Sequence, residues 1–119
     1  MEVKELRIDN WIKYNFKIQG WNDVQVCAND FHNGFRNDKF VSMNYKPIPL
    51  TEEWLLKFGF VFTKISQGFN QYRNGNVLQL SITPNGFEFF FNYKWINIKN
   101  VHQLQNLNFA LTNEELKLT

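Results

Sequence analysis

Residues 49–60, Pro-Leu-Thr-Glu-Glu-Trp-Leu-Leu-Lys-Phe-Gly-Phe, constrain the fold most, because they specify both ends of a short helix. Thr51 is a favourable N-cap, since its hydroxyl can accept a hydrogen bond from an unpaired backbone N–H of the first turn. The two glutamates that follow interact favourably with the positive end of the helix dipole. Gly59 readily adopts the left-handed conformation that ends a helix. This stretch therefore predicts a helix between Thr51 and Gly59.

The chain before this helix has the patterns of short strands. Residues 11–16 alternate between apolar and polar side chains, as a half-buried strand does. Residues 24–28 and 40–45 also have strand patterns. Residues 29–39 lie between them and are rich in Asn, Asp and Gly, so we interpret this segment as a loop. We expect the strands to form a small curled sheet or an SH3-like barrel.

The chain after the helix predicts an antiparallel meander, with strands at residues 60–65, 69–73, 76–83, 87–93 and 95–98. Asn74-Gly75 has the positive-φ preference of a two-residue hairpin turn. Pro84-Asn85-Gly86 favours the turn that follows. The alternation and the two turns together indicate consecutive hairpins.

A last helix is expected to begin at Asn100, with four apolar residues at helical spacing on its buried face: Val101, Leu104, Leu107 and Leu111. Three polar residues are expected on its solvent side: Gln103, Gln105 and Asn106. The predicted fold class is α+β: mostly antiparallel sheets, a short central helix, and a C-terminal helix packed on the sheet. A length of 119 residues fits one domain, with subregions 1–48, 49–60 and 61–119.

Composition excludes several classes of protein. The net charge of +2 argues against a strongly basic nucleic-acid-binding protein. The single cysteine, Cys27, excludes an intramolecular disulfide and fits a reducing compartment. No segment is apolar enough to cross a bilayer, and the first residues lack the apolar region of a signal peptide. We therefore expect a cytoplasmic protein with no membrane partner.

The sequence contains no strong catalytic signature and no metal-binding motif. Cys27 with His32 is the candidate for a nucleophile and its base, but a small buried residue on a strand is the favoured interpretation of Cys27. Asp30, His32 and Asp38 match no rigid ligand spacing. His102 is expected at the surface of the last helix. We therefore expect no enzymatic activity, no cofactor and no bound metal.

The segment 29–39 is the candidate partner-binding segment. Phe31, His32, Phe35, Arg36 and Lys39 lie there among residues too polar for a core. Exposed aromatic residues beside arginine are typical anchors of protein interfaces. In the alternative interpretation, Phe31 or Phe35 packs under the loop.

Nucleic-acid binding is a second possibility. Four aromatic residues alternate along the predicted strand 87–93: Phe87, Phe89, Phe91 and Tyr93. Such a stripe can stack nucleic-acid bases, but a strand that faces the core has the same pattern, which is the interpretation that we favour. Four basic residues are candidates for nucleic-acid contact: Lys64, Arg73, Lys94 and Lys99.

Residues 5–11, 47–60 and 101–112 resemble a family of small uncharacterised proteins that recur in bacteriophage genomes and prophage regions. The family has no established catalytic residues to transfer to this chain. The sequence departs from the family pattern at Asp9 and Asn113, where glycine is common, and at Asn108, where an aromatic residue is common. Asn113 is a mild change, because asparagine tolerates the left-handed conformation.

The resemblance implies an accessory protein of a phage or mobile element. By analogy with anti-CRISPR proteins, it implies a non-enzymatic inhibitor of a bacterial defence system, acting on a CRISPR nuclease or its guide-RNA-loaded complex. Such an inhibitor would be a monomer or a weak dimer in the cytoplasm of the bacterial host. The alternative is a small module that binds RNA or single-stranded DNA.

Overall fold

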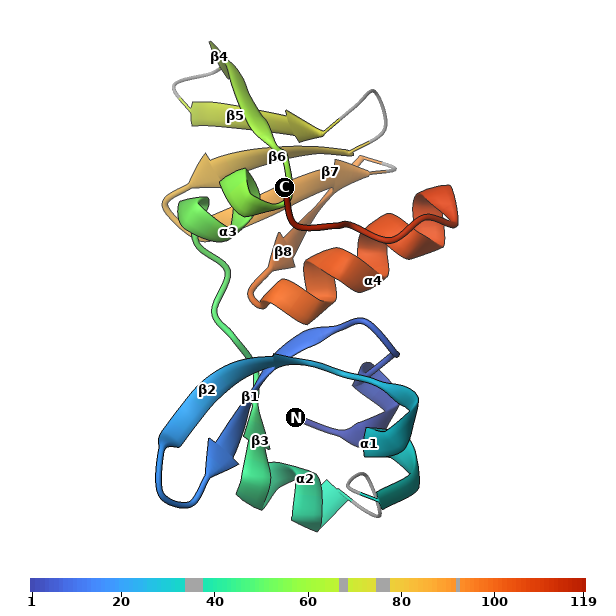
Figure 1. Cartoon of the computed structure of the whole chain (residues 1–119). Coiled ribbons are helices and arrows are strands. Elements are labelled where there is room, and N and C mark those ends of the chain that lie inside the picture. Colours follow the sequence, from blue (N-terminus) through green and yellow to red (C-terminus); the bar gives the residue numbers. More distant parts are fainter. Residues whose placement is uncertain (34–37, 67–68, 75–77, 92) are drawn as a thin grey trace. The chain divides into compact units, whose positions relative to one another are not determined.

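The computed structural model describes residues 1–33, 38–66, 69–74, 78–91 and 93–119, and these residues form an α+β fold with two antiparallel sheets, as expected (Figure 1). In chain order the elements are the 3-10 helix η1 (Val3–Glu5), strands β1 (Trp11–Phe16) and β2 (Gly20–Gln25), helices α1 (Ala28–Asn33) and α2 (Asp38–Asn44), strand β3 (Tyr45–Lys46), helix α3 (Glu52–Lys57), strands β4 (Val61–Ser66), β5 (Phe69–Asn74), β6 (Leu78–Thr83), β7 (Gly86–Phe91) and β8 (Lys94–Ile98), and helix α4 (Val101–Thr112).

The chain divides into two compact units. The first consists of Met1–Pro49 and Asn100–Asn106, and the second of Leu50–Lys99 and Leu107–Thr119. Neither unit is a continuous segment, because the chain passes from one to the other at three places. Helix α4 begins in the first unit and ends in the second.

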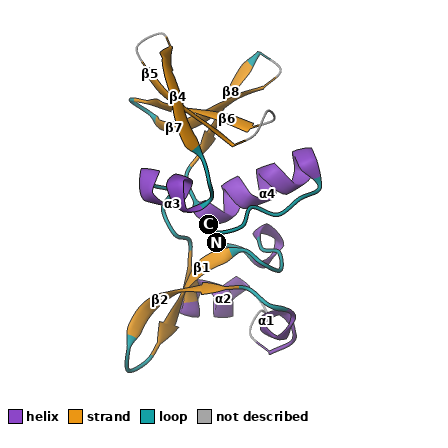
Figure 2. Ribbon diagram, turned by 45° about the horizontal axis from the view of Figure 1, so that its top comes forward, coloured by secondary structure: helices purple, strands orange, loops and turns teal. Residues whose placement is uncertain are grey.

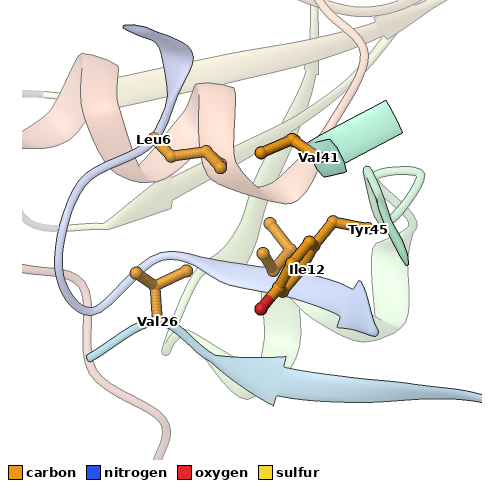
Figure 3. Close-up of a cluster of buried hydrophobic side chains, with 5 residues drawn as sticks. All are labelled: Leu6, Ile12, Val26, Val41 and Tyr45. Carbon is orange, nitrogen blue, oxygen red and sulfur yellow. The ribbon is translucent and has the colours of Figure 1, made fainter. Parts of the chain in front are cut away.

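The first unit is built on a sheet of strand order β2-β1-β3, in which both pairs are antiparallel. The prediction of a strand at 11–16 is confirmed. One face of the sheet contributes to a small apolar core, drawn in Figure 3, that comprises Leu6, Ile12, Val26, Val41 and Tyr45. The order leaves β2 and β3 at opposite edges, so the described strands form an open sheet and not an SH3-like barrel.

Two predictions for the first unit are wrong. Residues 29–39 are not simply a loop, because α1 and the start of α2 lie there, and residues 40–45 are mostly helical. Val41 and Tyr45 suggested alternation, yet they are also four residues apart, which is the spacing of one helix face. Both are buried, while Met43 between them is exposed, as a helix requires.

A cluster of buried amides ties the N-terminal segment to the first half of α4. The Gln105 side chain is fully buried, whereas the sequence predicted that it faces solvent. Its Oε1 accepts a hydrogen bond from the Trp11 backbone N–H at 2.8 Å, and its Nε2 donates to the Asp9 carbonyl at 2.9 Å. A buried backbone group without a partner is costly, so this one side chain stabilises both ends of the turn before β1.

Asn106 extends this cluster. Its Oδ1 accepts hydrogen bonds from Arg7 Nε at 2.8 Å and from Asn10 Nδ2 at 2.9 Å. Its Nδ2 donates to the Glu5 carbonyl at 2.8 Å. Both hydrogen-bonding ends of its amide are therefore occupied inside the first unit, and its predicted place on the solvent side is also wrong.

His102 is buried in the first unit, contrary to its predicted surface position. Its Nε2 lies 3.5 Å from Glu5 Oε1, and neither ring nitrogen makes a hydrogen bond to the described residues. Burial lowers the pKa of His102 below its ordinary value, and the Glu5 carboxylate partly opposes this shift. The fold therefore favours the neutral imidazole.

The second unit is built on a meander of strand order β4-β5-β6-β7-β8, with β4 and β8 at its edges (Figures 1 and 2). The predicted pairing of β5 with β6 is confirmed, but Asn74, predicted to lie in the turn, is the last residue of β5 and pairs with Leu78, and residues 75–77 lie outside the described residues. Gly86 has a φ of 107° in the turn between β6 and β7, as predicted. Leu80 and Phe89 are register partners and both are buried, so this face of the sheet is the core face.

Helix α3 has both predicted ends. Thr51 Oγ1 accepts from the Trp54 N–H at 3.3 Å. At the other end Phe60 N–H donates to the Leu55 carbonyl at 3.0 Å, and Gly59, at a φ of 85°, donates to the Leu56 carbonyl at 3.0 Å. This pair of bonds is a Schellman motif. Fully buried Leu55 and Phe60 then join the apolar interior of the second unit.

The second half of α4 packs with the five-stranded sheet, as expected. Asn113 ends the helix at a φ of 59°, and its N–H donates to the Phe109 carbonyl at 2.7 Å. The predicted apolar stripe is right for Val101 and Leu104, which are buried, but wrong for Leu111, which is exposed.

Candidate interaction surfaces

The predicted partner-binding segment is only partly described. Phe31 lies in α1, is half-buried and packs against the core of the first unit, which agrees with the alternative interpretation. Phe35 and Arg36 lie outside the described residues. His32 belongs to α1 and Lys39 to α2, but their side chains also lie outside the described part of the structure.

The four candidate nucleic-acid contacts form no cluster among the described side chains. The side chain of Lys64 in β4 lies outside the described residues, and exposed Lys99 follows β8. Arg73 lies on β5, where its guanidinium donates to Gln79 Oε1, and Lys94 begins β8. Three strand spacings separate β5 from β8, about 14 Å at the usual interval. The register also places Arg73 and Lys94 on opposite faces of the sheet.

The predicted stripe of aromatic residues on residues 87–93 faces the core only in part. Phe89 is buried and Phe87 is half-buried, so the core interpretation holds for these two. Tyr93 is not in the strand: it lies in a turn with a φ of 63° and is exposed. The side chain of Phe91 lies outside the described residues.

The groups considered for chemistry have structural roles where they are described. Cys27 is exposed just before α1, so the prediction of a buried strand residue is wrong. Its backbone N–H donates to Asp30 Oδ2 at 2.8 Å, and Asp38 Oδ1 accepts from the Val3 N–H at 2.8 Å. No three His, Cys, Asp or Glu residues among those described lie close enough together to hold a metal ion.

The first candidate surface is the end of the β1–β2 hairpin, which we call the hairpin tip and define as Phe16, Ile18, Trp21 and Lys46. Ile18 lies in the turn and is 99% exposed, while Phe16 and Trp21, on the flanking strands, are each 38% exposed. Gly20 closes the turn at a φ of 78°, a conformation that glycine adopts without strain. Three large apolar side chains are thus exposed at one end of the sheet.

Packed rings support the hairpin tip on both faces of the sheet. On the core face, the Tyr14 ring lies 4.8 Å from that of Phe16 and 4.9 Å from that of buried Tyr45. Burial raises the pKa of Tyr45 to about 12, so its hydroxyl stays protonated. On the other face, Lys46 Nζ lies 4.3 Å from the centre of the Trp21 ring, within cation–π distance. These contacts fix the rings that the tip exposes.

The second candidate surface lies on the second unit, and we call it the β8 edge: Phe90, Lys94, Trp95 and Ile96. Phe90 and Trp95 are register partners on β7 and β8, with ring centres 5.0 Å apart, and they are 51% and 49% exposed. Lys94 and Ile96 point to the opposite face of the same strand, because successive side chains of a strand alternate. Both are exposed.

Only weak signals in the sequence mark these surfaces. Ile18 stands between Lys17 and Gln19, and an apolar residue between polar ones in a turn signals exposure. The strand after residues 11–16 was predicted at residues 24–28, but it is β2, which begins at Gly20 directly after a turn at residues 17–19. Trp21 was consequently missed.

Both surfaces offer exposed aromatic and aliphatic side chains beside a lysine, a composition that suits binding to a partner more than catalysis.

No helix in the described part of the chain has the length and apolarity needed to span a membrane. No protein-family model, no curated protein and no solved structure matches the chain.

Proposed function

We propose that this chain is a non-enzymatic binding protein that acts by occupying the surface of a bacterial protein or ribonucleoprotein complex. The observation that supports this most is the hairpin tip. Phe16, packed against the Tyr14 ring, and Trp21, packed against Lys46, lose little conformational entropy on binding, and such residues provide much of the affinity at protein interfaces.

The proposed partner is a bacterial defence complex, such as a CRISPR nuclease or its guide-RNA-loaded form. The proposed setting is the cytoplasm of a phage-infected host. Support comes from the resemblance of residues 5–11, 47–60 and 101–112 to small phage and prophage proteins. The argument is by analogy with small phage proteins without catalytic groups, which often act against host defence by occupying a partner's surface.

Co-purification with candidate nucleases, together with a nuclease-inhibition assay, tests the proposal. Ile18→Asp is expected to weaken capture at least tenfold, because it places a charge where an apolar anchor enters the partner. Leu118→Asp is the matched control, since Leu118 is an exposed apolar residue of the C-terminal segment. The proposal fails if no defence complex is bound or blocked, or if Ile18→Asp inhibits as well as the unmodified protein.

A second candidate function is binding of RNA or single-stranded DNA. The exposed Phe90–Trp95 pair favours it, because paired rings on a sheet can stack bases. Arg73 and Lys94 lie on opposite faces, so this sheet offers the backbone phosphates little concentrated positive charge. Filter binding of single-stranded RNA and DNA tests it: affinity must fall steeply with added salt and with Trp95→Ala. An absence of affinity at low salt removes this candidate.

A further inference from the structure

Strand β8 is an edge with backbone groups available for pairing. It pairs with β7 on one side, and among the described residues no backbone hydrogen bond links Lys94–Ile98 to a segment outside the sheet. The chain covers this edge only beyond the strand, where the Lys99 carbonyl accepts from the Leu50 N–H at 2.9 Å. The available edge is therefore the five residues of β8 itself.

Strand β8 has few of the features that usually prevent an edge strand from pairing with another chain. Proteins protect their edges with charged side chains such as lysine, with proline, or with bulges, and of these β8 has one lysine, Lys94, at its first residue. The opposite edge of this sheet has such a device, because the register of β4 shifts between Phe62 and Lys64. Strand β8 pairs with β7 over five consecutive residues without a shift, and its sequence Lys-Trp-Ile-Asn-Ile favours extended structure. The backbone of β8 is therefore a regular template with which one more strand can pair.

We propose that the β8 edge binds an extended acidic segment of a partner protein by strand addition. An added strand alternates its side chains as β8 does. On the face of Phe90 and Trp95 it would place apolar side chains against the two rings. On the other face it would place a carboxylate beside Lys94.

Charge and size favour such a segment over a second copy of the chain. In an antiparallel pair of β8 strands centred on Ile96, each Lys94 lies beside Ile98 and near Lys99 of the other copy. The strand contains no carboxylate to compensate these like charges. Five residues are also a short contact compared with the roughly 800 Å² per partner of a stable interface. A short peptide segment of opposite charge meets neither objection.

This inference rests on the proposal that the chain is a binding protein and adds the chemical class of the segment that it recognises. The probe is a synthetic peptide that alternates Glu and Val over eight residues, with fluorescence anisotropy as the measurement on the full chain. A second peptide replaces Glu with Lys. A third carries N-methyl groups on alternate backbone nitrogens, on the edge that would pair with β8.

The Glu/Val peptide is expected to bind, and the Lys/Val and N-methylated peptides are expected to bind at least tenfold more weakly. Lys94→Glu should reverse the preference between the acidic and the basic peptide, and it should preserve the fold because Lys94 is exposed. Ile18→Asp should leave peptide binding unchanged, since it alters the hairpin tip alone. Peptide binding without capture of any defence complex would leave this inference standing while the proposed partner falls.

Four results would overturn the inference. The first is that none of the peptides binds. The second is that the N-methylated peptide binds as well as the unmethylated Glu/Val peptide, which would exclude backbone pairing. Single-stranded RNA displaces the acidic peptide, which would make nucleic acid the occupant of this edge. Sedimentation shows a dimer of the unmodified chain that Lys94→Glu strengthens, because the new carboxylate would lie near Lys99 of the other copy, and this result would make a second copy the occupant.

Discussion

The two units of this chain have different interiors. The first has a small apolar core (Figure 3) and, in addition, a cluster of fully paired amides from Asn10, Gln105 and Asn106. The second is predominantly apolar and aromatic, with Leu55, Phe60 and Leu80 fully buried. The stability of the first unit thus depends on specific hydrogen bonds, and that of the second depends on the apolar surface area that folding removes from water.

The difference shows what each unit tolerates. Apolar burial is nearly non-directional, so an apolar interior accepts changes that conserve volume. A buried amide depends on direction, and removing it leaves each of its former partners unpaired. Substitutions that conserve volume should therefore be mild in the second unit and damaging in the first.

The largest effect is expected from Leu55→Ala in the second unit. Leu55 is fully buried, so the cavity should lower the free energy of unfolding by about 2–5 kcal/mol. The matched control is Leu56→Ala, one position further along α3 at an exposed residue, where the loss should stay below about 0.5 kcal/mol. Urea denaturation followed by circular dichroism measures both. Equal losses would contradict the assignment of the helix faces.

The next effect is expected from Gln105 in the first unit. Gln105→Ala removes the acceptor of the Trp11 N–H and one of the two donors to the Asp9 carbonyl, which keeps its hydrogen bond from Gln25 Nε2, and it should cost about 1–3 kcal/mol. Gln105→Leu nearly restores the volume but not the hydrogen bonds, so it should be no better than Ala. If Leu restores stability in urea denaturation, the amide acts through its volume, and the contrast between the units is lost.

A smaller effect is expected from the protonation of His102. Its pKa is lowered in the folded chain, so its contribution to stability is complete above the unfolded value of about 6.5 and falls as the pH drops through the folded value. The Met1 amino group and the Glu5 carboxylate are the charged groups that act on it. Thermal unfolding between pH 7.5 and 5 should show this loss. It should shrink in His102→Gln, which retains His32 and so isolates the one ring.

The smallest effect is a gain in stability. Asp9 has a φ of 76°, so Asp9→Gly should relieve backbone strain and stabilise the first unit by about 0.5–1 kcal/mol. Gly59→Ala is the opposite change in the second unit, at a φ of 85°, and should destabilise by about 1 kcal/mol. Thermal melting compares the two. A loss of stability in Asp9→Gly would show that the Asp9 side chain contributes more than its backbone conformation costs.

Local signals allowed much of the second unit to be predicted. Thr51 and Gly59 define α3 because both capping interactions are made by residues within one short stretch. The predicted turn at Pro84-Asn85-Gly86 likewise separates β6 from β7, which pair as neighbours in sequence. Where the partners of a segment lie close by in the chain, the pattern identifies them.

The buried amides and the surfaces were not predictable in this way. Gln105 lies 96 positions after Asp9, so nothing near it in the sequence shows that it is buried. Phe16 has the spacing of a core residue but lies where the sheet ends, and no periodicity reveals that end. Arg36 and Phe35, which suggested an interface, lie outside the described residues, so that prediction stands as it was made.

The three passages of the chain between the units have a consequence for its synthesis. A ribosome releases residues 1–49 early, but the closing amides of that unit belong to Asn100–Asn106 and emerge only after residues 50–99 have been made. Until then the Trp11 N–H and the Asp9 carbonyl lack their hydrogen bonds to the Gln105 side chain. Residues 1–49 should therefore remain a target for chaperones and proteases until Asn106 has left the exit tunnel.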